Sequence, residues 1–115
     1  MADAIVFSDL PITASASGPQ TLVDAIDVSG YDELDLALGV AVVNTSSTIQ
    51  VSIITAMQNE DEAGWLTVGT FDLATTSGVW QKLTIRNCLR FIRYSVVVTG
   101  TGGAFTLQGL ARSWR

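Results

Sequence analysis

The sequence predicts an all-β protein: a single-domain antiparallel β-sandwich or jelly roll of about seven or eight strands within 115 residues. Large apolar residues alternate with small or polar ones in several segments, which is typical of strands with one buried face. Turn-forming residues separate these segments at intervals of roughly ten residues, a spacing common in sandwiches and jelly rolls. No segment shows the sustained 3.6-residue apolar period of a helix, so we expect at most a single helical turn in a loop.

The N-terminal segment differs from the rest of the chain. Residues 1–12 hold a short apolar run that Pro11 soon interrupts. Because proline has no backbone N–H to donate to a sheet, we expect this segment to form an arm or an edge strand. Residues 13–115 then form the sandwich domain. Within it, residues 13–20 predict a loop and residues 20–28 carry a weak strand pattern.

The clearest strand signal lies in residues 34–43. Every second position from Leu34 to Val42 is a large apolar residue, as a core-facing strand requires. The side chains between them begin polar and become small and apolar, so we expect the second half of the other face to be covered as well. A turn at residues 44–48 leads to residues 49–57, which alternate similarly. We expect this second segment to pair with the first as its antiparallel partner.

The remaining strands follow an acidic, polar tip at residues 58–64. The last two of them flank the glycine-rich turn Gly100–Gly103, which predicts a hairpin. A phosphate-binding loop would need a helix directly after the glycines, and here a strand follows. The predicted strands after the tip are residues 65–72, 79–85, 91–98 and 104–112.

Charge is segregated along the chain. All eleven acidic residues lie at or before Asp72, and all six basic residues lie at or after Lys82, for a net charge of −5. Hydrophobic residues make up 48% of the chain and charged residues 15%, and the mean hydropathy is +0.39. A small monomer has little use for so much apolar surface, so we expect a homo-oligomer with apolar interfaces. Segregated charge favours head-to-tail contacts between its subunits.

These properties also bear on the choice of partner. No apolar run approaches the roughly 20 residues of a membrane-spanning helix, so we expect no membrane contact. The start of the chain lacks the features of a secretory signal. The arginines could bind nucleic acid through its phosphates, but the net negative charge and the lack of a known motif favour acidic protein surfaces, within or between subunits. The predicted interface residues are Val6, Phe7, Arg86, Arg90, Arg93, Arg112, Trp114 and Arg115.

The residues needed for catalysis are missing. There is no histidine, the usual general base and the commonest metal ligand, and Cys88 is the sole cysteine. We expect Cys88 to be a small buried hydrophobic residue. The acids at 32–35 and 60–62 lack the spacing of a calcium loop, and nothing indicates a carboxyl pair for glycoside hydrolysis. We therefore predict a non-enzymatic protein with no catalytic residue, cofactor or metal site, although calcium or a glycan at the 58–64 tip stays open.

Three tryptophans allow a second interpretation. Trp65, Trp80 and Trp114 would ordinarily fill a core or an interface, because each buries roughly 150–250 Å². An exposed Trp65 or Trp80 beside the acidic tip would instead form a platform on which a sugar ring can stack. The alternative function is therefore a carbohydrate-binding sandwich module.

Several short motifs recur in a known class of proteins. They are IDVSGY at 26–31, LDLAL at 34–38, Trp65 followed by GTF at 69–71, TTSG at 75–78 and FIRYS at 91–95. Over nearly its whole length the chain resembles small virion proteins of tailed bacteriophages. The tip departs from their pattern, because it reads NEDEAG at 59–64 where they prefer a short Ser/Asp-Gly hairpin.

The resemblance implies a β-sandwich protein that coats or completes the virion. Such a protein is a capsid decoration (cement) protein or a head or tail accessory, made in the bacterial cytoplasm. Under the carbohydrate-binding alternative, the resemblance implies a part of the virion that contacts a receptor. It implies a homo-oligomer, with a trimer favoured, that contacts the major capsid protein or other virion proteins. Neither its position on the particle nor its oligomer number follows from the sequence.

Overall fold

A computed structural model describes residues 2–7 and 11–113 of the chain. This part contains ten β-strands and one short 3-10 helix. In chain order they are β1 (Ala2–Val6), β2 (Ile12–Ala14), β3 (Gly18–Pro19), the 3-10 helix (Leu22–Asp24), β4 (Ile26–Asp27), β5 (Glu33–Val43), β6 (Thr48–Ala56), β7 (Leu66–Thr70), β8 (Val79–Ile85), β9 (Phe91–Thr99) and β10 (Gly103–Arg112).

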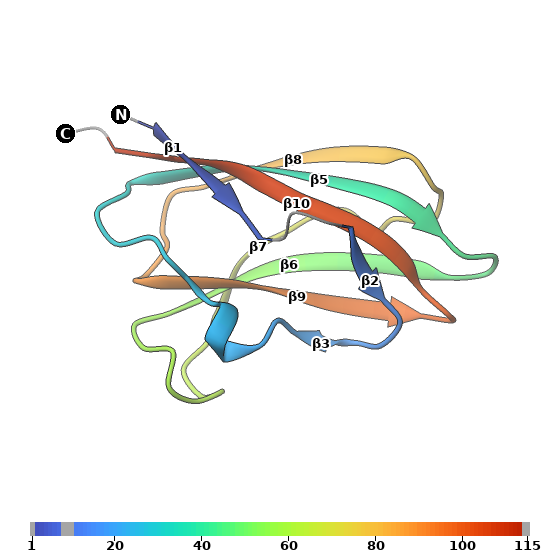
Figure 1. Cartoon of the computed structure of the whole chain (residues 1–115), viewed down its shortest axis with the longest axis horizontal. Coiled ribbons are helices and arrows are strands. Elements are labelled where there is room, and N and C mark those ends of the chain that lie inside the picture. Colours follow the sequence, from blue (N-terminus) through green and yellow to red (C-terminus); the bar gives the residue numbers. More distant parts are fainter. Residues whose placement is uncertain (1, 8–10, 114–115) are drawn as a thin grey trace.

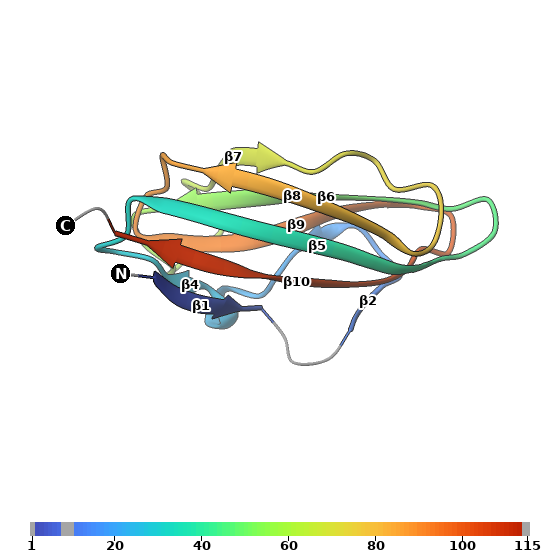
Figure 2. The same cartoon turned by 90° about the horizontal axis from the view of Figure 1, so that it is seen from above.

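The strands form two antiparallel sheets packed face to face, which confirms the predicted sandwich (Figure 1). The β5 sheet has the order β1-β10-β5-β8, with β2 also paired to β10. The β6 sheet has the order β3-β9-β6-β7, with β4 also paired to β9. Figure 1 views the two layers edge-on with the β5 sheet above, and Figure 2 looks down onto the β5 sheet. The molecule measures 45 × 29 × 22 Å.

The strand order is that of a jelly roll. Early strands pair with late ones in a nested series: β1 and β2 with β10, β3 and β4 with β9, β5 with β8, and β6 with β7. One long antiparallel ribbon is thus folded over into two layers. The remaining pairings, β10 with β5 and β6 with β9, complete the sheets. This is the double-sheet arrangement found in viral capsid and lectin domains.

Two predicted strand pairings are wrong. Residues 34–43 and 49–57 were expected to pair with each other, but β5 and β6 lie in different sheets. Residues 91–98 and 104–112 were expected to form a hairpin, but β9 and β10 also lie in opposite sheets. In each case the short loop crosses between the layers, because the buried faces of the two strands point toward each other across the core. Alternation identifies the buried face of a strand and leaves its neighbour undetermined.

The Gly100–Gly103 turn is one of these crossings, and its glycines are required by packing. Gly102 has a φ of 78°, and a Cβ on it would lie 1.7 Å from the carbonyl oxygen of Ala14. The hydroxyl oxygen of buried Ser47 accepts hydrogen bonds from the backbone N–H groups of Thr101 (3.0 Å) and Gly102 (3.3 Å). The turn therefore fits tightly between β2 and the β5–β6 loop.

The predicted core face of β5 is confirmed from Leu34 to Val40 and is wrong at Val42, which is 45% exposed. A β-bulge opposite Ala104 and Phe105 adds Ala41 to the strand and so reverses the alternation beyond Val40. Leu34, Leu36, Leu38 and Val40 are each at most 2% exposed. They belong to the same apolar cluster as the equally buried inward residues of β6, which are Ile49, Val51 and Ile53.

The N-terminal third is more structured than the loop and weak strand predicted from sequence. Residues 13–20 contribute to β2 and β3, and residues 20–28 hold the 3-10 helix and β4. β1 forms an edge of the β5 sheet, with Ala4 opposite Leu110 and Val6 opposite Gln108. Within the described ranges, no helix is long and apolar enough to cross a membrane.

Candidate assembly interface

The basic side chains of the C-terminal third pair with acids from the first two-thirds of the same chain. Arg86 bonds to Glu33 at 2.7 Å, and Arg90 lies 3.4 Å from Asp27. These links join the β8–β9 loop to the start of β5 and to β4. The charge segregation seen in the sequence is thus largely satisfied within one subunit, which is one of the two arrangements expected for these arginines.

Arg112 is neutralised in the same way. Its Nε atom donates to Asp35 at 2.6 Å and lies 3.9 Å from Glu33. The hydrogen bonds from Arg112 and from the Thr84 hydroxyl hold the pKa of Asp35 below its usual value. Arg112 and Asp35 both remain partly exposed, so the pair lies at the surface of the β5 sheet.

Arg93, expected at a subunit interface, is instead buried in its own chain. Its side chain is 1% exposed, although it projects from the outer face of the β6 sheet. The loop between β6 and β7, residues 57–65, folds back beneath β9 (Figure 1). Glu62 and Trp65 of this loop contact the Arg93 side chain and cover it. We call residues 57–65 the tip loop. The expected role of Arg93 as a contact residue is therefore wrong, because no surface of it remains for a neighbour.

Three groups hold the Arg93 guanidinium. Nη1 and Nη2 donate to the two carboxylate oxygens of Glu62, at 3.1 and 2.8 Å, and Nη1 also donates to the carbonyl oxygen of Gln20 at 2.5 Å. The Trp65 ring lies over the guanidinium, with Cζ 4.2 Å from the ring centroid. The Nε atom of Arg93 is buried without a hydrogen-bond partner among the described residues. We call Arg93, Glu62 and Trp65 the clasp.

The tip loop also has internal hydrogen bonds. The Trp65 indole N–H donates to the carbonyl oxygen of Asp61 at 3.0 Å, and a carboxylate oxygen of Asp61 accepts from the backbone N–H of Ala63 at 2.8 Å. Together with the clasp, these bonds fix the shape of the loop and leave the Glu60 side chain exposed. From the sequence, this segment was interpreted as an acidic, polar tip. The sequence feature that indicates its attachment to the sandwich is Trp65, which closely follows the acidic residues 60–62.

The outward face of the β5 sheet is apolar over much of its area. Strand register and alternation place Val6, Val42, Trp80 and Leu110 on this face. They are 51%, 45%, 65% and 39% exposed. Only isolated apolar residues are normal on the surface of a monomer, and a contiguous group marks an interaction site. This face is therefore the candidate interface.

Trp80 lies flat against the sheet. A Cβ on Gly39, its cross-strand partner in β5, would lie 2.7–2.8 Å from three atoms of the Trp80 ring. The indole thus covers Gly39 on the outward face of β5, whereas Ala41, in the second half where the sequence predicted a cover, is exposed. The other face of the indole is open to solvent, since Trp80 is 65% exposed.

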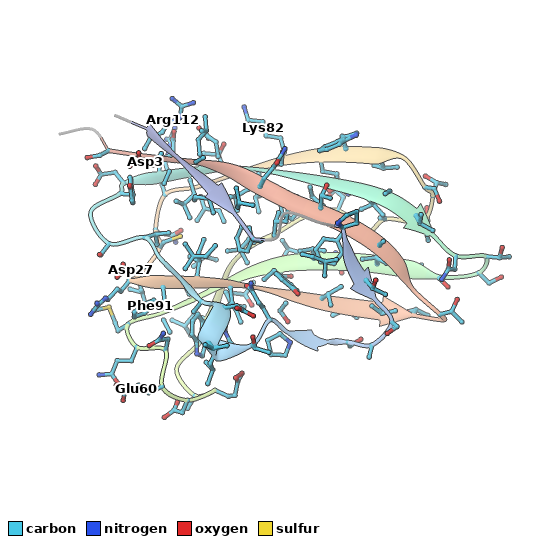
Figure 3. All side chains as sticks on the ribbon, viewed as in Figure 1. Asp3, Asp27, Glu60, Lys82, Phe91 and Arg112 are labelled. Atoms are coloured by element: carbon cyan, nitrogen blue, oxygen red, sulfur yellow. The ribbon has the colours of Figure 1, made fainter. Side chains whose placement is uncertain are left out.

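A groove of about 470 Å³ lies beside Trp80 on the same face. Small residues form its floor, with Ala37 between Gln108 and Lys82 in one cross-strand row and Ala4 beside Leu110 in the next. Because long side chains surround small ones, the face is hollow here. Figure 3 shows Lys82 and Arg112 extending from this side of the molecule, away from the β6 sheet. The full lining is Ala4, Ile5, Val6, Asp35, Leu36, Ala37, Lys82, Gln108, Gly109, Leu110 and Arg112.

The other predicted interface residues divide into three cases. Val6 is exposed on the candidate interface. Phe7 is partly buried and packs edge-on against Tyr94, with ring centroids 6.3 Å apart, so its ring contributes to its own sandwich. Trp114 and Arg115 lie outside the described residues.

Two further sites were considered from sequence. Burial raises the pKa of the Cys88 thiol to about 11, so the thiol is protonated at neutral pH and is a poor nucleophile. Across residues 2–7 and 11–113, no group of three or more Cys, Asp or Glu side chains is placed to hold a metal ion. At the tip, Glu62 is bound by Arg93 instead.

No protein-family model matches the sequence, and no curated protein matches it. Among solved structures, the chain is similar to the SPBc2 prophage-derived protein YomS. The TM-score is 0.56 at 14% sequence identity, and the alignment covers 96% of this chain and 92% of that one. The two proteins share a fold over nearly their whole lengths.

Proposed function

We propose that this chain is a non-enzymatic structural protein of a bacteriophage virion, and specifically a capsid decoration protein that acts as a homo-oligomer, with a trimer favoured. The observation that carries the proposal is the apolar outward face of the β5 sheet, where four large side chains are exposed and two of them, Val6 and Leu110, line a groove. Such a surface is costly for a free monomer and is typical of a protein that works in an assembly.

The fold supports the same function. Jelly rolls are common in viral capsid proteins, and the similar chain of known structure is prophage-derived. The sequence motifs that resemble tailed-phage virion proteins include FIRYS at 91–95, in which Arg93 anchors the tip loop. This arginine thus has a structural role in presenting the tip.

The proposed mechanism is mechanical. A protein that binds adjacent subunits of the assembled shell, and not the separated subunits, raises the free energy needed to open the shell. The partners are copies of this chain and the major capsid protein or other virion proteins. The protein is made in the host cytoplasm and functions in the virion, without binding nucleic acid or membrane.

A matched pair of variants tests whether the β5 sheet is the assembly surface. Leu110→Glu places a charge on its outward face, and Val97→Glu places the same charge on the outward face of the β6 sheet, where Val97 is 57% exposed. Sedimentation equilibrium should show an oligomer for the wild type and Val97→Glu, and dissociation for Leu110→Glu. A wild-type chain that stays monomeric and does not co-sediment with phage capsids would contradict the proposal.

Carbohydrate binding is the second candidate, because the exposed, flat-lying Trp80 indole could stack on a sugar ring. Trp65 is less suited, since one face of its ring is occupied by Arg93. Binding on a glycan array that Trp80→Ala abolishes and Trp65→Phe preserves would favour this function. Loss of oligomerisation in Trp80→Ala without any glycan binding would favour assembly.

A further inference from the structure

Building on the proposed assembly, we propose that the groove on the β5 sheet binds the tip loop of a second copy of this chain, with Lys82 facing Glu60. The contact is head to tail, since two different surfaces of the protein meet. This assigns an occupant to the groove and a role to the acidic tip.

The positions of the two surfaces require separate chains. The groove opens on the outward face of the β5 sheet, and the tip loop lies beneath the β6 sheet on the opposite side of the sandwich (Figures 1 and 3). A subunit therefore cannot place its own tip in its own groove. A heterologous contact of this kind generates a closed ring when the rotation between subunits closes, and a filament when it does not.

Charge makes the two surfaces complementary. At the groove, Arg112 is neutralised by Asp35, whereas the ammonium of Lys82 lies beyond ion-pair distance of every described acid. The charge of Lys82 acts on Asp35 only at longer range, as a minor cause of the lowered pKa of Asp35. At the tip, Glu62 is neutralised by Arg93, whereas Glu60 forms no ion pair within the described ranges and is exposed. Each surface thus retains an unpaired charge, of opposite sign. Pairing charges of opposite sign across an interface fixes register and speeds association.

The apolar surfaces match as well. Met57, at the start of the tip loop, is 61% exposed, and Leu89 is 37% exposed. Both line a hollow together with Asp61. The groove presents Ala4, Val6 and Leu110. An apolar centre bordered by charged groups is the usual anatomy of a protein–protein interface.

The clasp prepares the tip for binding. Arg93 holds Glu62 with two hydrogen bonds and stacks on Trp65, so the loop is ordered before it meets a partner. Ordering a flexible loop on binding would weaken affinity, and a preformed loop avoids this cost.

Charge reversal tests the contact directly. Lys82→Glu and Glu60→Lys should each weaken self-association at least about tenfold, measured as the dissociation constant by sedimentation equilibrium. Combining them in one chain restores an attractive pair and should recover most of the wild-type affinity. Added salt should weaken association of the wild type and of the double variant. Glu60 is preferred to Asp61 for this test because Asp61 bonds to the loop backbone.

Two controls separate this contact from a change in net charge. Asp72→Lys changes the charge as Glu60→Lys does, at an exposed site outside the tip loop. The double variant Thr45→Glu/Thr76→Glu lowers the net charge by the same amount as Lys82→Glu, and both of its substitutions lie on exposed loops. Both should assemble as the wild type does, and all variants should retain its circular dichroism spectrum.

The outcomes also distinguish this inference from the proposed function. If the wild type assembles and both single reversals still assemble, the groove–tip contact is wrong, while assembly through the β5 sheet can stand. If Lys82→Glu dissociates but Glu60→Lys does not, the groove has a different occupant and the inference is overturned. A wild-type protein that is monomeric and does not co-sediment with phage capsids would contradict both proposals.

Discussion

Arg93 on β9 and Glu62 in the tip loop are joined by two hydrogen bonds, of 3.1 and 2.8 Å, between a side chain that is 1% exposed and one that is 59% exposed. The pair thus spans the boundary between the sandwich and its surface loop. We expect this pair to contribute more to the stability of the folded monomer than the exposed arginine pairs elsewhere in the chain.

Arg93→Ala should destabilise the folded monomer. The change removes the hydrogen bond to Gln20 and the stacking on Trp65, and leaves a cavity beneath the tip loop. We expect a loss of about 2–4 kcal/mol in the free energy of unfolding, measured by urea denaturation. Arg90→Ala is the control, because its pair with Asp27 is exposed at 3.4 Å and should contribute at most about 1 kcal/mol. Equal effects of the two changes would show that burial of Arg93 has little energetic weight.

The clasp should open in acid. The Arg93 hydrogen bonds hold the pKa of Glu62 below its usual value. Stability from a carboxylate with a lowered folded-state pKa is fully present above its unfolded pKa, about 4.3, and is lost as the pH falls through the folded value. The indole N–H signal of Trp65 in an NMR titration should therefore shift below about pH 4. In Glu62→Gln the signal should already be shifted at pH 7 and should lose this transition, and a transition that persists would assign it to another group.

Leu36→Asp should unfold the domain, because Leu36 is 1% exposed and the substitution places an unpaired charge in the core. Ala37→Asp, one residue along, points to the outward face and should fold with a native circular dichroism spectrum. It should nevertheless weaken self-association, because Ala37 lines the groove. A folded Leu36→Asp protein would mean that the two faces of β5 are interchanged.

Gly102→Ala should be more costly than Gly78→Ala. Both glycines have a positive φ, near 79°, so both substitutions incur a backbone penalty of about 1–2 kcal/mol. A Cβ at Gly78 meets nothing within 4 Å, whereas at Gly102 it would collide with the carbonyl oxygen of Ala14. We expect at least about 2 kcal/mol of additional destabilisation for Gly102→Ala in thermal unfolding. Similar values would indicate that β2 moves aside readily.

The sequence predicted well those features that depend on local residue pattern, namely the buried faces and the bounds of the longer strands. Alternation located the buried face of β5, and the strands β8, β9 and β10 lie within two residues of their expected bounds. It failed where the answer depends on a distant segment. The two- and three-residue strands β2, β3 and β4 are too short to show a period, and they exist because β9 and β10 provide partners.

The same limit applies to the candidate interface. Arg93 occupies an outward position on β9, and only the tip loop folding over it makes it buried. The groove was not visible in the sequence either, because its lining comes from β1, β5, β8 and β10. The signal that could have suggested an exposed interface on this face was the run of small residues on the outward side of β5.

The central place of β10 in its sheet has a consequence for biosynthesis. β10 is the last described strand, yet it separates β1 and β2 from β5, with Ala2 opposite Arg112. During translation this edge of β5 therefore stays open to pairing with other nascent chains until β10 has left the ribosome. Folding is thus expected to be slow, as for other proteins dominated by long-range strand pairing. Overproduction would therefore favour inclusion bodies unless chaperones shield this edge.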